Sequence, residues 1–265
     1  MTAYCMSGAA GRMGRTIISC QQQAGLSLAG ALEREGSEFL GQDAGSLAGI
    51  GALGISVVAE PNKALKGAAS VIDFSSPENT LNLAQACAEQ GVGLVVGTTG
   101  FSAQQRKDLE SFAAKIPLLI SPNMSTGVNV LFHLTRMAAK VLGKDYAAEV
   151  TEIHHRHKKD APSGTAVKLL EIIEQEFGLT SEHVAHGRSG LTGARPSDEI
   201  GSHALRGGDV VGDHTVFFLG EGERIEITHR ASSRNTFAMG ALRAAAWLDG
   251  QKPGLYTMDD VLGLG

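Results

Sequence analysis

An alternation of short apolar stretches with amphipathic ones fills the first half of the chain and constrains its fold more than any other feature. Short strands are predicted over residues 3–6, 27–32, 70–74, 94–96 and 117–121. Helical patterns separate several of them, over residues 16–20, 79–90 and 102–114. Strands that alternate with helices form a parallel sheet, and ligands bind beyond the carboxyl ends of its strands. The sequence therefore predicts an α/β domain with a ligand at that edge.

A glycine-rich turn follows the first strand, as it does in Rossmann-like dinucleotide-binding domains. Glycines permit a tight turn and close approach of a pyrophosphate, and the helix N-terminus behind them favours negative charge. The predicted cofactor-binding residues of this turn are Gly8, Ala9, Ala10, Gly11, Arg12, Met13 and Gly14. Their spacing is GxxGxxG, not the common GxGxxG, so the turn alone does not exclude an ordinary strand-to-helix connection.

The second strand ends in Glu33 and Arg34, about 20 residues beyond the glycines, where such domains recognise the adenosine ribose. An acidic residue there binds the 2′-hydroxyl of NAD, and an arginine binds the 2′-phosphate of NADP. Because the chain has both, NADH and NADPH are both candidate cofactors. Two later strand ends are also candidate cofactor loops, although their residues equally suit plain turns. They contain Gly97, Thr98 and Thr99, and Ser121, Pro122, Asn123 and Met124.

Residues 152–166 combine three histidines, two lysines and an arginine with a predicted helix start. Strand alternation puts Glu152 and His154 on one face and His155 on the other. Ser163 is a candidate N-cap, so amides in the first helical turn favour an anion. Such a group of proton donors and cations is expected where an anionic substrate is bound and protonated. The alternative interpretation is a basic strand end before an ordinary capped helix.

The histidine-rich segment resembles the signature of the 4-hydroxy-tetrahydrodipicolinate reductase family. It contains His154-His155-Arg156-His157-Lys158, followed by Asp160-Ala161-Pro162-Ser163-Gly164-Thr165-Ala166. The glycine turn, both cofactor loops and Ala231-Ser232-Ser233-Arg234-Asn235-Thr236-Phe237 extend the resemblance over nearly the whole chain. It implies that a small cyclic dicarboxylate is reduced with NADH or NADPH and loss of water, in lysine and diaminopimelate biosynthesis.

The resemblance also implies roles for single residues. His154 is then the proton donor or acceptor, and Lys158 is the second catalytic group. His155, Gly164 and Thr165 contact the substrate. Apart from the resemblance, the planar guanidinium of Arg234 makes it a candidate clamp for a carboxylate. The implied fold is a Rossmann-like domain with a mixed-sheet α+β domain that forms a homotetramer.

The boundaries that we predict give a dinucleotide-binding domain over residues 1–126, completed by residues 236–265. A substrate-binding and oligomerisation domain fills residues 127–235. Its strands are expected over residues 146–155, 203–206, 214–219 and 224–230, and its helix over residues 166–177. The glycine-rich stretch 187–198 is expected to be a mobile loop or one ordered by a neighbouring subunit.

Composition narrows the class of protein. A net charge of −5 gives no reason to expect nucleic acid or an anionic membrane as a partner. Cys5, Cys20 and Cys87 are odd in number and their spacing fits no zinc site, so we expect them to be reduced thiols of a cytoplasmic protein. We also expect no signal peptide, because no basic region followed by an apolar stretch is seen at the N-terminus. His203, His214 and His229 are interpreted as structural, so no metal site is predicted.

Two alternatives remain open at this stage. One is another two-domain NAD(P)-dependent reductase, such as an aspartate-semialdehyde or sugar dehydrogenase. The semialdehyde enzyme needs a nucleophilic cysteine in its second half, and no cysteine follows Cys87. The other is a regulator that senses a dinucleotide without turnover. The cluster of cations argues against it, and a turnover assay decides the question.

Overall fold

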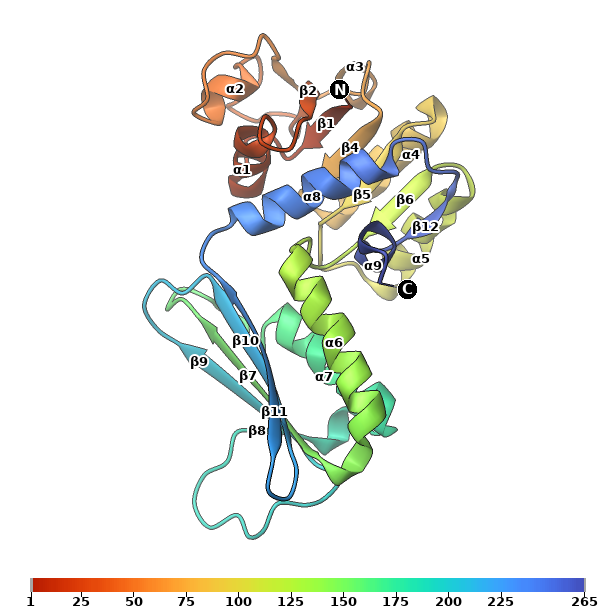
Figure 1. Ribbon diagram of the computed structural model, residues 1–265. Coiled ribbons are helices and arrows are strands. Elements are labelled where there is room, and N and C mark those ends of the chain that lie inside the picture. The colour runs from red at the N-terminus through yellow and green to blue at the C-terminus, as the bar shows by residue number, and fades with distance from the viewer. Residues whose placement is uncertain (1, 265) are drawn as a thin grey trace. The chain divides into compact units, whose positions relative to one another are not determined.

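The structure is a computed structural model that describes residues 2–264 of the chain. It divides into two compact units (Figure 1). The first runs up to Thr126 and resumes at Arg234, and the second is Gly127–Ser233. Arg234, which the sequence pattern assigns to the second domain, therefore belongs to the first unit.

The first unit is built on a parallel sheet of seven strands in the described part of the chain. Apolar runs such as 93–96 are buried along their whole length, as strands covered on both faces must be. In spatial order the strands are β12 (Gly254–Tyr256), β6 (Pro117–Ile120), β5 (Gly93–Val96), β4 (Ser70–Asp73), β1 (Ala3–Ser7), β2 (Ser27–Leu32) and β3 (Val57–Val58).

Helices cover both faces of this sheet (Figure 1). The helices of the unit are α1 (Arg12–Cys20), α2 (Ala44–Leu47), α3 (Pro61–Ala64), α4 (Pro77–Gln90), α5 (Ala103–Ser111), α8 (Asn235–Leu248), α9 (Met258–Leu262) and the 3-10 turn η1 (Phe112–Ala114). Alternate strand residues point to opposite cores, so Tyr4 and Met6 pack with α1, α8 and α9, whereas Cys5 packs with α4 and α5. The sequence pattern for a Rossmann-like domain is confirmed.

The second unit is a mixed sheet with two long helices on one face (Figure 1). The spatial order of its strands is β11 (Arg224–Ala231), β10 (Gly212–Leu219), β7 (Ala147–His154), β9 (Ile200–Arg206) and β8 (Val184–His186). β7 and β11 both pair antiparallel with β10, while β9 is parallel to both β7 and β8. The helices are α6 (Thr126–Leu142) and α7 (Gly164–Phe177), with 3-10 turns η2 (Gly143–Asp145) and η3 (Ser181–His183).

Several boundaries differ from the sequence-based expectation. β7 ends at His154 and not at His155, because the amide of His155 donates to the carbonyl of Val210 in a loop instead of continuing the sheet. The edge strands β3, β8 and β12 have two or three residues each, too few to show a period.

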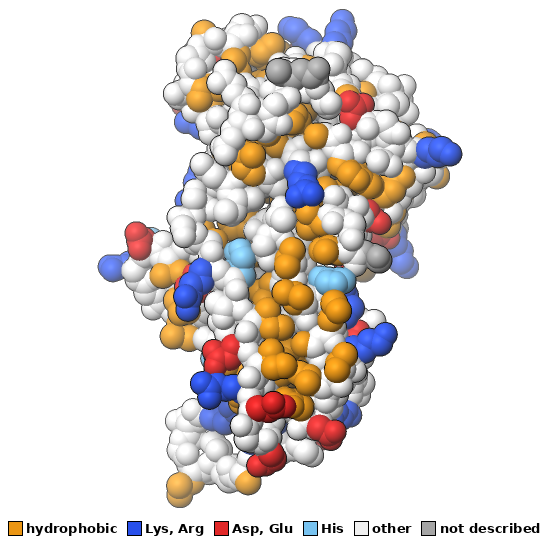
Figure 2. All heavy atoms as spheres, in the orientation of Figure 1, with side chains coloured by type: hydrophobic (Ala, Val, Ile, Leu, Met, Phe, Trp, Pro, Cys, Tyr) orange, Lys and Arg blue, Asp and Glu red, His pale blue; other side chains and the backbone are white. Residues whose placement is uncertain are grey.

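The outer side of α6 carries exposed apolar residues in the second unit. Leu134, Met137 and Val141 are 44%, 54% and 83% exposed, and Figure 2 shows hydrophobic side chains gathered along this helix. Among the described residues, no helix has both the length and the apolar character needed to cross a bilayer.

Candidate functional site

The glycine turn forms a backbone cradle at the carboxyl end of β1. The amides of Gly8 and Ala9 both donate to the carbonyl of Leu32, at 3.0 and 3.1 Å. A Cβ at Gly8 would lie 2.4 Å from the carbonyl oxygen of Phe74, and one at Gly14 would lie 2.1 Å from that of Gly8. Gly11 is the N-cap residue of α1, and it makes no side-chain hydrogen bond to the first amides of the helix. A tight turn that needs glycine at two positions thus leads into α1, as in the phosphate turns of dinucleotide-binding domains.

Glu33 and Arg34 lie beside this cradle. The amide of Ala10 donates to Glu33 Oε1 at 2.9 Å, so the carboxylate is held against the phosphate turn. Arg34 is exposed, as is Arg12. Arg15 joins the turn without having been predicted, because its Nε donates to the carbonyl of Ala10 at 2.8 Å. Its place one helical turn beyond Gly11 was the only available signal.

A buried carboxylate ties together the strand ends at the cofactor edge. Asp73, at the end of β4, is fully buried and accepts four hydroxyl hydrogen bonds of 2.6–2.7 Å. The donors are Ser7, Ser75, Thr80 and Thr98. The hydroxyl of Thr98 also accepts from the amide of Ser75 at 2.9 Å. The Thr98 side chain thus shapes the loop from inside.

The remaining predicted cofactor residues line the ends of β5 and β6. Ser121 donates through its amide to Val96 and through its hydroxyl to the carbonyl of Asn123, at 3.1 and 2.8 Å. Met124 is buried in the core, whereas Pro122 is exposed. At the end of β5, Thr99 is exposed and Gly97 packs against the ring of Phe74, where a Cβ would lie 2.3 Å away.

The second unit holds a buried carboxylate–imidazole pair. His154 Nδ1 lies 2.5 Å from Glu152 Oε2, and the two residues are 8% and 1% exposed. Arg206 of β9 donates to both carboxylate oxygens, at 2.7 and 2.8 Å. The amide of Ser163 donates to Oε1 at 3.0 Å, which joins the pair to the start of α7.

His214 of β10 completes the cluster. Its ring meets that of His154 edge to face, with centroids 5.1 Å apart, and its Nε2 lies 3.0 Å from Ser163 Oγ. Burial, and next the proximity of His154, lower the pKa of His214 to about 3, so this imidazole stays neutral. The sequence interpretation of His214 as structural did not foresee that it packs on His154.

Opposing influences set the ionisation of His154. Burial lowers its pKa below the ordinary value, and the charges of Lys158 and Arg206 act in the same direction. The bond to Glu152 acts the other way without restoring the ordinary value. Burial alone would raise the pKa of Glu152, but donors on Arg206 and His154 outweigh it and lower that pKa. At neutral pH we therefore assign a carboxylate beside a neutral imidazole.

The other predicted substrate residues divide between the two units. Lys158 Nζ forms an ion pair with Asp160 at 2.9 Å. His155 Nδ1 is buried without a hydrogen-bond partner among residues 2–264. Gly164 and Thr165 open α7, and the predicted cap is confirmed because Ser163 Oγ accepts from the amide of Ala166. Arg234 is exposed at the start of α8 in the first unit.

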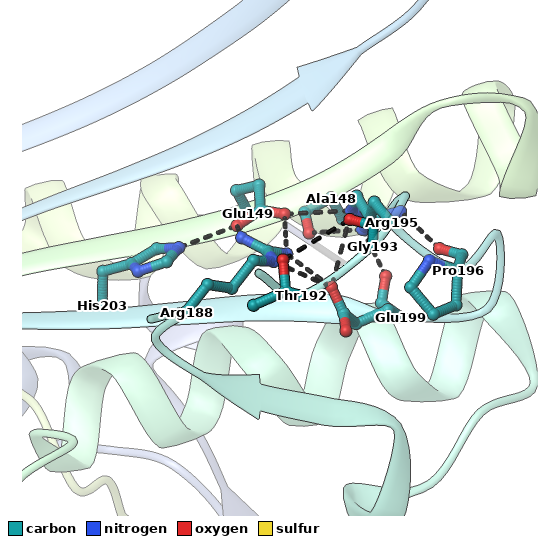
Figure 3. A network of polar contacts seen from close by, with 9 residues as sticks. All are labelled: Ala148, Glu149, Arg188, Thr192, Gly193, Arg195, Pro196, Glu199 and His203. Carbon is teal, nitrogen blue, oxygen red and sulfur yellow. Dashed lines mark hydrogen bonds and ion pairs between the residues drawn. The ribbon is translucent and has the colours of Figure 1, made fainter. Parts of the chain in front are cut away.

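A second polar network fastens the glycine-rich loop 187–199 (Figure 3). The guanidinium groups of Arg188 and Arg195 converge on Glu149 of β7, at 2.7 and 3.0 Å, and His203 Nε2 lies 2.8 Å from it. Burial alone would raise the pKa of Glu149, but the donors on these three residues outweigh it and lower that pKa to about 2. The loop is thus anchored within its own chain.

The network predicts a pH-dependent stability. Because the pKa of Glu149 is lower in the folded state than its unfolded value of about 4.3, its contribution is present above pH ~4.3 and lost as pH falls towards 2. Glu149→Gln should lower the free energy of unfolding at pH 7 by about 2 kcal/mol and flatten its decline below pH ~4.3. Urea unfolding at several pH values measures both effects.

Glu110→Gln is the control for this prediction. It breaks an ion pair between Arg106 and Glu110, whose side chains are 42% and 36% exposed, so it should change the free energy of unfolding by less than about 1 kcal/mol. The decline of that free energy below pH ~4.3 should remain. If the decline of the free energy of unfolding below pH ~4.3 stays unchanged in Glu149→Gln, the lowered pKa of Glu149 is not its cause.

No group of three or more His, Cys, Asp or Glu side chains among residues 2–264 is arranged to hold a metal ion.

A glycine-rich turn at the carboxyl edge of a parallel sheet is typical of dinucleotide-binding domains, and a buried imidazole paired with a carboxylate is a candidate acid–base group. A chain with one of these in each of two units has the features of two-domain nicotinamide-dependent oxidoreductases. Sequence models of dihydrodipicolinate reductase match both halves, its N-terminal part at residues 3–124 and its C-terminal part at residues 127–262. The chain belongs to the dihydrodipicolinate reductase family.

Individual relatives are similar in sequence to this chain along its full length. A 4-hydroxy-tetrahydrodipicolinate reductase of Anaeromyxobacter dehalogenans is 56% identical, over 100% of this chain and 98% of the relative. The enzyme of that name from Geobacter sulfurreducens is 48% identical over 100% of both chains. A dipicolinate-bound dihydrodipicolinate reductase from a Paenisporosarcina species has the same fold, with a TM-score of 0.78 at 22% identity over 97% of each chain.

Proposed function

We propose that His154 and Lys158 supply the acid chemistry with which this chain reduces 4-hydroxy-tetrahydrodipicolinate to tetrahydrodipicolinate. The chain has this NAD(P)H-dependent activity as a member of its family, and the reaction belongs to lysine and diaminopimelate biosynthesis. The observation that carries the assignment of roles is the buried Glu152–His154 pair next to the start of α7.

Substrate binding uses the positive features of the second unit. Amides of Gly164 and Thr165 lie in the first turn of a 14-residue helix, where a carboxylate is stabilised. Lys158 adds a cation on a flexible stem, and the buried Nδ1 of His155 offers a further polar contact. Arg234, on the first unit, is proposed to bind a carboxylate of the substrate.

The chemistry needs one hydride, one proton and the loss of water. A reduced nicotinamide, bound over the residues of the glycine cradle and the loops after β5 and β6, would supply the hydride. The substrate loses its hydroxyl group as water, and addition of hydride to the conjugated imine leaves an enamine carbon that must take up a proton. His154 is proposed to deliver this proton from Nε2, with Lys158 stabilising or relaying it.

The charge of the substrate is proposed to prepare the acid. Burial, together with Lys158 and Arg206, lowers the pKa of His154 in the free protein. A bound dicarboxylate adds negative charge nearby, which favours the imidazolium and raises that pKa. The high-pH limb of kcat should therefore lie at higher pH than the high-pH limb of kcat/KM. Steady-state rates from pH 5 to about 10 measure both limbs; coincident limbs would contradict the proposal.

Cofactor choice is proposed to depend on Glu33 and Arg34. The carboxylate of Glu33 is held at the glycine turn, and Arg34 is exposed next to it in the chain. Glu33 can therefore bind the ribose 2′-hydroxyl of NADH, and Arg34 can bind the 2′-phosphate of NADPH. Arg34→Ala should lower kcat/KM for NADPH about tenfold and leave that for NADH nearly unchanged. Glu33→Gln is the complementary variant and should penalise NADH more. Equal losses with both cofactors in Arg34→Ala would refute this role.

We further propose a cytoplasmic homotetramer. The exposed apolar residues of the second unit, among them Leu205 and Ile225 at 46% and 42% exposure, support burial against further copies. Light scattering after size-exclusion chromatography should give four times the mass of the 27.6 kDa chain.

The activity is tested directly with the purified protein. Substrate is generated in situ from pyruvate and aspartate semialdehyde, and oxidation of NADH and of NADPH is followed by absorbance. Turnover that requires both precursors supports the proposal. Stoichiometric binding of a dinucleotide with no turnover would favour the regulator instead, and turnover of aspartate semialdehyde alone would favour another reductase.

A further inference from the structure

We infer that Glu152, held in place by Arg206, is the positioning residue that fixes the tautomer and the ring orientation of His154. This inference deepens the proposed function and rests on His154 being the proton donor. The proposed function assigns no step of the reaction to Glu152 or to Arg206.

The strand geometry fixes the pair. Glu152 and His154 are two residues apart on β7, so their side chains leave the same face of the sheet. Arg206 is the parallel-ladder partner of His154 on β9, which brings its guanidinium over both oxygens of the carboxylate. Arg206 also donates to the carbonyl of Asp160 at 2.7 Å and so holds the loop that carries Lys158.

The hydrogen-bond inventory then assigns the tautomer. An ionised carboxylate can only accept hydrogen bonds. The carboxylate of Glu152 is contacted by Arg206 Nη1 and Nη2, by the amide of Ser163 and by His154 Nδ1. Nδ1 must therefore carry the hydrogen, which leaves Nε2 as the nitrogen that accepts and delivers the catalytic proton. Gly212 keeps space beside that nitrogen, because a Cβ there would lie 2.9 Å from Nε2.

Charged and titratable groups face His154 from each neighbouring element. Glu152 lies on its own strand, Arg206 on β9, His214 on β10, and Lys158 in the following loop. The carboxylate stabilises the imidazolium, whereas the cations and the burial oppose it. Removal of Glu152 and removal of Arg206 should thus change the protonation of His154 in opposite directions, which a purely structural role does not require.

The experiment compares Glu152→Gln with Arg206→Gln in the full-length protein, using the high-pH limb of kcat. We expect kcat to fall about 10- to 100-fold in each, by analogy with the loss of groups that orient metal-ligating imidazoles, with KM for NADH little changed. The limb should move to lower pH in Glu152→Gln and to higher pH in Arg206→Gln.

Glu149→Gln is the matched control. It alters another buried carboxylate of β7 that also binds arginine, on the opposite face of the strand, and it should not move the limb. Gly212→Ala places a methyl group beside Nε2 without touching Glu152, and it should lower kcat at an unchanged limb.

Imidazole ¹⁵N chemical shifts of the unaltered protein give a second readout that does not depend on any variant folding. We expect a hydrogen on Nδ1 of His154, and a hydrogen on Nε2 alone would overturn the inference. Limbs that move in the same direction in both variants, or that do not move, would overturn it as well. If His154→Gln itself keeps full turnover, the proposed function fails first, so the two failures can be told apart.

Discussion

Replacing His154 with glutamine should lower kcat by about 10²- to 10⁴-fold, the contribution usual for a positioned general acid. Glutamine can keep a hydrogen bond to Glu152 but has no group that delivers a proton near neutral pH. The proposed dinucleotide-binding residues lie in the other unit, so the affinity for NADH should change little. Single-turnover kinetics measure the chemical step, and quenching of NADH fluorescence measures the affinity.

His157→Gln is the control for this variant. His157 belongs to the same histidine-rich segment, is exposed and has no role in the proposed chemistry. Turnover close to that of the unaltered protein is expected. If His154→Gln and His157→Gln retained the same turnover, proton delivery would have to be assigned elsewhere, with Lys158 as the next candidate.

Gly8→Ala should weaken cofactor binding. Gly8 has a φ of +75°, and its new Cβ would lie 2.4 Å from the carbonyl oxygen of Phe74, which is backbone and cannot rotate away. The turn must then shift, and with it the start of α1, whose first amides are proposed to bind the pyrophosphate. We expect the dissociation constant for NADH to rise more than about tenfold, equivalent to ~1.4 kcal/mol, and the melting temperature to fall. Calorimetry and thermal unfolding measure the two effects.

Gly25→Ala separates the close contact from the backbone strain. Gly25 has nearly the same φ, +71°, but nothing lies within 4 Å of its Cβ position. Both variants therefore carry the left-handed penalty of about 1–2 kcal/mol, while only Gly8→Ala disturbs the phosphate turn. Gly25→Ala should lose stability and keep NADH affinity. Equal loss of affinity in both variants would show that the fit of the turn at Gly8 is not the cause.

Much of the candidate site followed from local patterns. The turn around Gly8 and the cap at Ser163 were predictable because each depends on residues within one helical turn. The shared face of Glu152 and His154 follows from the period of a strand. No such pattern pointed to Arg206, which lies 54 residues beyond Glu152 in the chain.

The sequence by itself determined most of the longer strands and helices, where the glycine cradle lies and which histidines belong to one segment. Those features depend on the periods of the backbone and on close neighbours in the chain. Only the tertiary structure decided which buried charges meet. Asp73 gathers hydroxyl groups from several elements, Glu149 draws in the long loop, and Arg206 reaches Glu152. The pairing order of the strands selects these partners, because a buried carboxylate must find its donors among whatever side chains the neighbouring strands and loops bring to it.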